Sequence, residues 1–208
     1  MDPFAVARLL PQGTVPDLFH GRAYAGLVFF RMEDLAFRHG PPLPYVGSFN
    51  EANVRVYSRD EKGRRGVVFL SLDCDRLVPA VGARAGFGLP YRWSRISRHW
   101  YGRRLLYRVQ DRRPHRPGGL AWVDVSDEVI TPGPLDRFLT HRWGLHEEGP
   151  WGRYYMGLTH PVWPFRRCDP LDWDTTPLMS AGVTPLRAEP DSVLFSPGVA
   201  VRFGLPGR

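Results

Sequence analysis

The chain has 208 residues, of which 43% are hydrophobic and 13% aromatic, and this composition fits one folded domain over residues 1–208. The two cysteines are far apart and in no metal-ligand spacing, so we expect no zinc site, no disulfide framework, and no metal or other cofactor. The net charge of +7 raises the question of nucleic-acid binding, but the arginines are spread over the whole chain, and we expect no specific nucleic-acid partner.

That expectation depends on where five arginines lie. These residues are Arg95, Arg98, Arg104, Arg108 and Arg112. If they formed one contiguous exposed stripe, nucleic-acid binding would be favoured. No charged-then-apolar leader is visible, and the apolar runs are far shorter than the roughly 20 residues of a membrane helix. We therefore expect a soluble cytoplasmic protein that does not enter a membrane, with a homo-oligomer as an open alternative.

The first half of the chain predicts one short helix and three strands. The apolar spacing of residues 2–11 indicates an amphipathic helix that stops at a proline, and the apolar run at residues 23–32 predicts a buried strand. The prolines of residues 39–47 predict a fixed loop. Residues 48–59 and 65–74 flank the turn sequence "DEKG" and predict a β-hairpin.

The second half alternates strands with short helices. The predicted helices cover residues 77–86 and 131–144, each ending at a glycine, and the predicted strands cover residues 92–101, 103–111, 120–126, 153–160 and 198–204. We expect residues 161–190 to be irregular, with a helical turn at "TTPLMSAG". These elements predict a β-dominated α+β domain, either a closed barrel or a sandwich, with few short helices.

The strand "SFNEANVRVY" carries a polar stripe. Its period of two places Glu51, Asn53, Arg55 and Tyr57 on one face and small apolar residues such as Val54 on the other. The polar face either meets water or lines a cavity, and the pattern alone does not separate the two. In a cavity, the arginine would hold a carboxylate and the glutamate would act as an acid or base.

Several segments together resemble the YqjF-like proteins, a bacterial family related in fold to acetoacetate decarboxylase. The resemblance runs through "LLPQGTVPDLFHGRAYAGLVFFRM", "PPLPYVGSFNEANVRVY", "GVVFLSLD", "ARAGFGLPY", "FLTHRWGL" and the late "HPVW". It implies a curved sheet or barrel that encloses a cavity, with small helices outside. It also implies that Glu51 faces this cavity, because "SFNEANV" is similar to the decarboxylase segment that carries a cavity glutamate.

The same resemblance draws attention to "FGLPYRWSRI". In the decarboxylases a turn of this kind precedes two lysines, the first of which forms a Schiff base with the substrate. Here Tyr91 and Arg92 occupy those positions, and neither a phenol nor a guanidinium forms an imine. Lys62, at a polar hairpin tip, does not replace them. If the protein is an enzyme, we expect a lyase, isomerase, cyclase or hydrolase that works without an imine.

We therefore predict a small organic ligand, an oxygenated acid or a polyketide-like compound. The expected catalytic residues are Glu51, Tyr91 and Arg92. The expected ligand-binding residues are Asn53, Arg55, Tyr57, Ser94, His160 and Trp163. The alternative is a non-catalytic ligand-binding or interaction module of the same fold.

Overall fold

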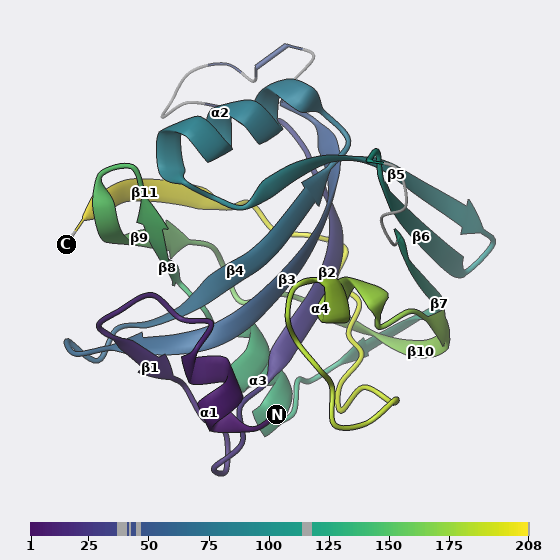
Figure 1. Ribbon diagram of the computed structural model, residues 1–208. Coiled ribbons are helices and arrows are strands. Elements are labelled where there is room, and N and C mark those ends of the chain that lie inside the picture. The colour runs from purple at the N-terminus through teal and green to yellow at the C-terminus, as the bar shows by residue number, and fades with distance from the viewer. Residues whose placement is uncertain (37–40, 42, 45–46, 114–117, 208) are drawn as a thin grey trace.

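One curved sheet forms the body of the protein (Figure 1). The structure is a computed structural model, and it describes residues 1–36, 41, 43–44, 47–113 and 118–207. The predicted proline-fixed loop at residues 39–47 lies largely outside the described residues. Among the helices of the described part, none is long and apolar enough to cross a membrane.

Eleven strands and four helices make up the described part of the chain. The strands are β1 (Thr14–Pro16), β2 (Ala25–Met32), β3 (Phe49–Asp60), β4 (Arg65–Cys74), β5 (Tyr91–Tyr101), β6 (Arg104–Asp111), β7 (Gly118–Ile130), β8 (Gly144–Gly149), β9 (Gly152–Thr159), β10 (Phe165–Trp173) and β11 (Arg202–Gly207). The helices are α1 (Pro3–Ala7), α2 (Leu77–Phe87), α3 (Pro134–Thr140) and α4 (Thr176–Ser180). The β-dominated fold class is confirmed.

Strand β4 is the branch point of the sheet. Its predicted hairpin partner β3 pairs along one edge, and on the other edge β8 pairs at Val67 while β5 pairs from Leu72 to Cys74. From β5 the sheet continues outward as β6, β7 and β10, and from β8 as β9 and β11, while β1 and β2 pair with β3. No pairing between described strands joins the two ends, so the sheet curls without closing into a barrel.

Both faces of β3 are buried, each by a different core. On the face of Val54 and Val56, side chains of α1 and α4 complete an aliphatic core around Val68. On the opposite face, Tyr57 packs with Phe138 of α3 and with residues of β8 and β9. The interpretation in which the Glu51 face meets water is therefore wrong.

Three expectations for the second half of the chain need correction. Residues 161–190 are not wholly irregular, because β10 pairs with β7 as an edge strand in which Pro170 coincides with a register shift. The helix predicted over residues 131–144 is α3, which ends at Thr140. Gly144 instead begins β8, where a side chain would collide with the Tyr155 ring. The last strand begins at Arg202. The helical turn expected within "TTPLMSAG" is confirmed as α4.

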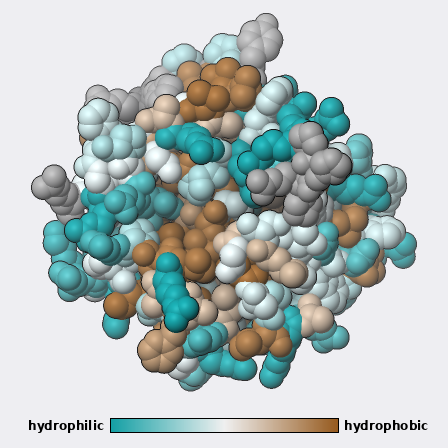
Figure 2. All heavy atoms as spheres, in the orientation of Figure 1, coloured by the Kyte–Doolittle hydropathy of each residue, from teal (hydrophilic) through white to brown (hydrophobic). Residues whose placement is uncertain are grey.

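Helix α2 lies across the top of the sheet (Figure 1), where its one buried residue, Ala80, packs against Phe49 and Cys74. Its other apolar residues are largely exposed, including Val78 and Val81. Figure 2 shows the corresponding apolar patch at the top of the molecule. The face of β3 beneath α2 is the one that carries Glu51.

Candidate functional site

Glu51 and Tyr91 meet in the interior. The Tyr91 hydroxyl donates a hydrogen bond to Glu51 Oε2 at 2.6 Å, and the Asn53 amide donates to Glu51 Oε1 at 3.2 Å. The exposed fraction is 2% for Glu51 and 3% for Asn53. The carboxyl group is therefore held from both oxygens by neutral donors, with no cation bound to it among the described residues.

The turn before β5 places Tyr91 at this position. Helix α2 ends at Gly88, whose φ of 72° is a left-handed conformation that glycine adopts easily. A Cβ there would also lie 2.6 Å from the backbone of Glu148 and Gly149. The chain then pairs Tyr91 with Leu72 of β4, two residues from the Cys74 that pairs with Glu51.

Burial controls the ionisation of this pair. The pKa of Glu51 is raised from 4.5 to about 7, chiefly by burial; the hydrogen bonds from Tyr91 and Asn53 lower it, and the nearby Asp73 carboxylate makes a smaller contribution that raises it. Burial and the Glu51 charge together raise the pKa of Tyr91 well above its ordinary value. Near neutral pH, Glu51 can therefore both hold and release a proton, while Tyr91 remains a hydrogen-bond donor.

Arg55 and Asn53 continue the same face toward α3. Arg55 donates to the Leu139 carbonyl at 3.3 Å, and its guanidinium lies 5.8 Å from the centre of the Tyr57 ring. Two buried polar atoms on this face, Asn53 Oδ1 and Arg55 Nε, have no hydrogen-bond partner among the described residues. Since such atoms are normally paired, one acceptor and one donor on the Glu51 face of β3 are open to a ligand.

Arg92 and Ser94 lie on the other face of the sheet. Because neighbouring residues of a strand alternate, Arg92 points away from Tyr91, and it forms an ion pair with Asp73 at 2.6 Å. The Ser94 hydroxyl donates to the other Asp73 oxygen, also at 2.6 Å. The structure thus brings Glu51, Tyr91, Asn53 and Arg55 onto one face but does not bring Arg92 or Ser94 to them.

The remaining predicted residues lie elsewhere. Tyr57 packs in the core beside Phe138. His160 follows β9, where its ring stacks on Trp143 at 5.6 Å and its Nε2 lies 3.0 Å from the Arg142 carbonyl oxygen. Trp163 contacts His160 edge to face at 6.0 Å. No contact described for these three residues connects them with Glu51.

Glu147 is a buried carboxyl that sequence reasoning missed. Its Oε1 accepts a hydrogen bond from the Phe69 backbone N–H at 2.7 Å. Phe69 lies on β4 between Val67, which pairs with β8, and Leu72, which pairs with β5. Burial raises the pKa of Glu147 from 4.5 to about 8. The sequence feature that could have revealed it is the run "GLHEEGPWGRYYMG", which is typical of two strands joined by a turn between glycines. In the first of these strands, Leu145 and Glu147 lie on one face.

A serine, a histidine and an aspartate also meet near β8, where they contact one another between β3 and β8. His146 Nδ1 lies 2.8 Å from Ser58 Oγ, and His146 Nε2 lies 3.5 Å from Asp60 Oδ2. Ser58 has no exposed surface, and Asp60 is already bound by Arg64 at 2.6 Å. This cluster therefore ties strands together.

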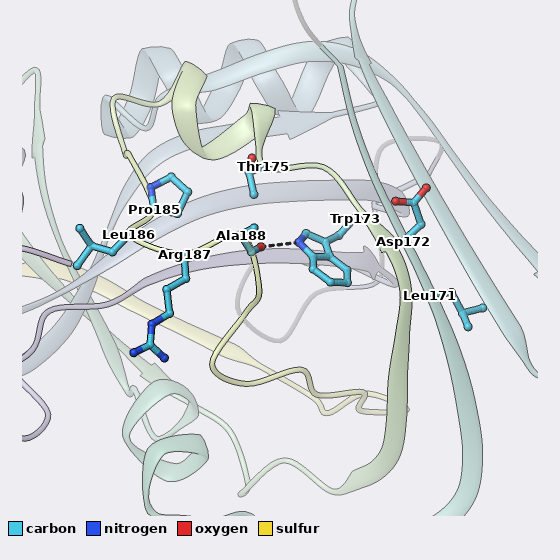
Figure 3. A pocket seen from close by; sticks show the side chains of 8 residues that line it. All are labelled: Leu171, Asp172, Trp173, Thr175, Pro185, Leu186, Arg187 and Ala188. Carbon is cyan, nitrogen blue, oxygen red and sulfur yellow. Dashed lines mark hydrogen bonds between the residues drawn. The ribbon is translucent and has the colours of Figure 1, made fainter.

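Two surface pockets are described, and neither includes Glu51. The first has a volume of about 590 Å³ and lies between the end of β10 and residues 185–188, where the Trp173 indole donates to the Ala188 carbonyl at 2.9 Å (Figure 3). The second, of about 430 Å³, lies beside the β3–β4 turn. Lys62 is exposed in that turn, remote from Tyr91. Among the described residues, no group of three or more His, Cys, Asp or Glu side chains is placed to hold a metal ion.

Comparison with solved structures shows the fold. The chain resembles acetoacetate decarboxylase from Legionella pneumophila, with 15% identity and a TM-score of 0.54, over 98% of this chain and 76% of that one. It also resembles the enduracididine biosynthesis enzyme MppR complexed with pyruvate, with 16% identity and a TM-score of 0.57, over 98% and 79%. An acetoacetate decarboxylase-like enzyme from Sphingomonas wittichii RW1 gives 14% identity and a TM-score of 0.56, over 99% and 85%.

Sequence comparison gives the family. The uncharacterized protein YqjF of Bacillus subtilis (strain 168) is 28% identical over 166 residues, which are 78% of this chain and 68% of that protein. The family DUF2071, described as an uncharacterized conserved protein, matches residues 1–200. The predicted relationship to YqjF-like proteins is therefore confirmed, and the chain belongs to the DUF2071 family.

Proposed function

We propose that the Glu51 face binds a small oxygenated organic acid or polyketide-like compound, and that Glu51 exchanges a proton with this ligand. The observation that carries the proposal is the Tyr91–Glu51 hydrogen bond of 2.6 Å inside a buried site. A carboxyl with a pKa near 7 is suited to general acid–base catalysis at neutral pH. The enzymes among the fold neighbours support a small-molecule role.

Each residue has a distinct task in this proposal. The Glu51 carboxylate accepts a proton from a carbon next to a ligand carbonyl, and the Arg55 Nε–H donates to the oxygen on which negative charge develops. The free Asn53 Oδ1 accepts a hydrogen bond from a ligand hydroxyl. Tyr91 orients Glu51 through its hydrogen bond. Either Arg55 or Arg92 could stabilise the anion by sequence, and Arg55 is assigned this role because Arg92 is occupied by Asp73.

Pyruvate is a suitable probe because the MppR neighbour is complexed with it. We expect the protein to accelerate exchange of the pyruvate methyl protons for deuterium in D₂O, followed by proton NMR. Glu51→Gln should lower the exchange rate by roughly 100-fold or more, which is the ordinary contribution of a general base. Borohydride added during the reaction should leave no covalent adduct by mass spectrometry, because no amine is found among the residues of the Glu51 face.

The second candidate is a binding module without catalysis. It is favoured because both Glu51 oxygens already accept hydrogen bonds within the protein, while the unpaired Asn53 Oδ1 and Arg55 Nε remain as binding groups. It predicts that saturation-transfer NMR detects bound pyruvate while no exchange occurs above the rate in buffer. If pyruvate neither binds nor exchanges, a small keto acid is not the ligand of this face.

A further inference from the structure

The outer face of β5 and β6 gathers four of the five arginines whose alignment in one exposed stripe would favour nucleic-acid binding. In the β5–β6 register, Arg95 is opposite Gln110, Arg108 is opposite Ser97, and Arg104 is opposite Tyr101. Since paired residues share a face and every second residue returns to it, Arg95, Arg104 and Arg108 project together. Arg98 instead projects from the other face, beside Tyr107.

Arg112 extends this face beyond the end of β6. Its guanidinium lies 4.0 Å from the centre of the Trp93 ring, which places it at the next step of the same row. We call the surface formed by Trp93, Arg95, Tyr101, Arg104, Arg108 and Arg112 the arginine face. Figure 1 shows β5 and β6 projecting as a pair from the body of the protein.

The arginine face carries positive charge that the protein itself does not neutralise. Arg95, Arg108 and Arg112 are exposed, and no ion pair is formed by any of them among the described residues. Arg104 is partly compensated, because its Nε lies 3.5 Å from Asp124. Such a surface is complementary to a row of phosphates.

Two aromatic rings lie on the same face. Trp93 is 41% exposed and Tyr101 is 59% exposed, so part of each ring is open to solvent. They are eight residues apart on one strand, a separation of roughly 27 Å. Exposed rings next to arginines can stack on unpaired bases, which a duplex keeps inside its own stack.

From this combination we infer that the arginine face binds single-stranded nucleic acid without sequence preference. The phosphates contact Arg95, Arg104, Arg108 and Arg112, and bases stack on Trp93 and Tyr101. The inference is independent of the proposed small-molecule function, because every residue of the arginine face lies outside the Glu51 pair and its partners. It also agrees with the net charge of +7.

Fluorescence polarisation with a labelled oligothymidylate of about 16 nucleotides tests this surface. We expect binding at low salt, with log K falling against log salt with a slope of roughly −2 to −3, from three or four arginine contacts at about 0.7 each. The double variant Arg95→Gln/Arg108→Gln should reduce this slope by about 1.4. The matched control Arg8→Gln/Arg202→Gln removes the same charge from other exposed positions and should leave the slope unchanged.

The aromatic rings give a second, salt-independent arm. Trp93→Leu/Tyr101→Leu should weaken binding at least about fivefold while the slope stays the same, because stacking releases no counterions. Circular dichroism and thermal unfolding of each variant check that the fold is retained. The inference is overturned if the oligonucleotide does not bind at low salt, if the control variant lowers the slope as much as the Arg95/Arg108 variant, or if a duplex binds as tightly. Binding to anionic phosphatidylserine vesicles without binding to the oligonucleotide also overturns it.

Discussion

Tyr91 and Arg92 follow one another in β5 but project onto opposite faces of the sheet, where each contacts a different carboxylate. Tyr91 bonds to Glu51, which accepts two neutral donors, whereas Arg92 bonds to Asp73, which also accepts from Ser94. One turn of the chain thus supplies a proton donor to a buried acid on one side and an ion pair on the other. The two residues should therefore respond to mutation in different ways.

The two arginines provide the first test of this separation. Lysine keeps the charge at either position but loses the planar guanidinium and its Nε donor. We expect Arg55→Lys to weaken pyruvate binding about tenfold or more, because the free Nε of Arg55 is buried on the Glu51 face. Arg92→Lys should change it less than about twofold. Titration by NMR measures both constants, and a larger effect of Arg92→Lys would place the ligand on the Asp73 face instead.

Removing the Tyr91 hydroxyl should make Glu51 a weaker acid. The 2.6 Å hydrogen bond is as short as those that hydroxyls donate to ionised carboxylates, and it lowers the pKa of Glu51 against the larger effect of burial. In Tyr91→Phe the pKa of Glu51 should therefore rise above about 7. Carbon-13 NMR of labelled glutamate side chains measures it directly. Tyr107→Phe, which removes a hydroxyl on the other face, should leave the Glu51 titration in place.

Glu51 should also make the stability of the protein depend on pH. In the unfolded chain its carboxyl loses its proton near pH 4.5, but in the folded protein it keeps the proton until about pH 7. Between these values the folded state binds more protons, so the free energy of unfolding falls as the pH rises. The raised pKa corresponds to about 3 kcal/mol across that window.

Glu51→Gln removes this dependence, which gives a paired measurement. Urea unfolding of the wild type and the variant should show the variant gaining stability relative to the wild type from about pH 5 to about pH 8. Glu147, whose pKa is also raised, is present in both proteins and cancels in the comparison. An unchanged difference between the two proteins over this range would mean that Glu51 titrates at its ordinary value.

Some of the site could be predicted from residue spacing, because a strand has a strict period of two. That rule placed Glu51, Asn53 and Arg55 on one face, and the hairpin around "DEKG" fixed the neighbour of that strand. The same rule, applied to β5, would have separated Tyr91 from Arg92. Burial of both faces of β3 was not predictable, because periodicity shows that two faces differ but not what covers each of them.

Strand β8 was not among the predicted strands, which explains why Glu147 was not found. Gly144 was interpreted as the stop of a helix, so the following residues had no strand to place them on a face. The structural role of Gly144 is instead to let the Tyr155 ring approach β8. A glycine required by a distant aromatic ring has the same local signature as a helix-ending glycine, and only the tertiary structure distinguishes them.

The last prediction compares Gly82, inside α2, with Gly88, at the C-cap of α2. Substitution by alanine should raise the stability of the protein at the first position and lower it at the second. Gly82 lies inside α2, and a Cβ there would meet no described atom within 4 Å beyond its chain neighbours and the nearby backbone of its own helix. Gly82→Ala should therefore stabilise the protein by up to about 1 kcal/mol through helix propensity. Gly88 has a φ of 72°, and its Cβ would meet the Glu148 carbonyl oxygen and Gly149 Cα at 2.6 Å. Those are backbone atoms of β8 that cannot rotate away.

Gly88→Ala should therefore destabilise the protein by more than the roughly 1–2 kcal/mol that a left-handed conformation alone costs. Because the turn from Gly88 leads directly to Tyr91, the strain should also disturb the Tyr91–Glu51 hydrogen bond and shift the Glu51 titration. Urea unfolding and carbon-13 NMR measure the two effects on the same variants. If Gly88→Ala lost stability while the Glu51 titration stayed that of the wild type, the turn would support the fold without setting the geometry of the acid.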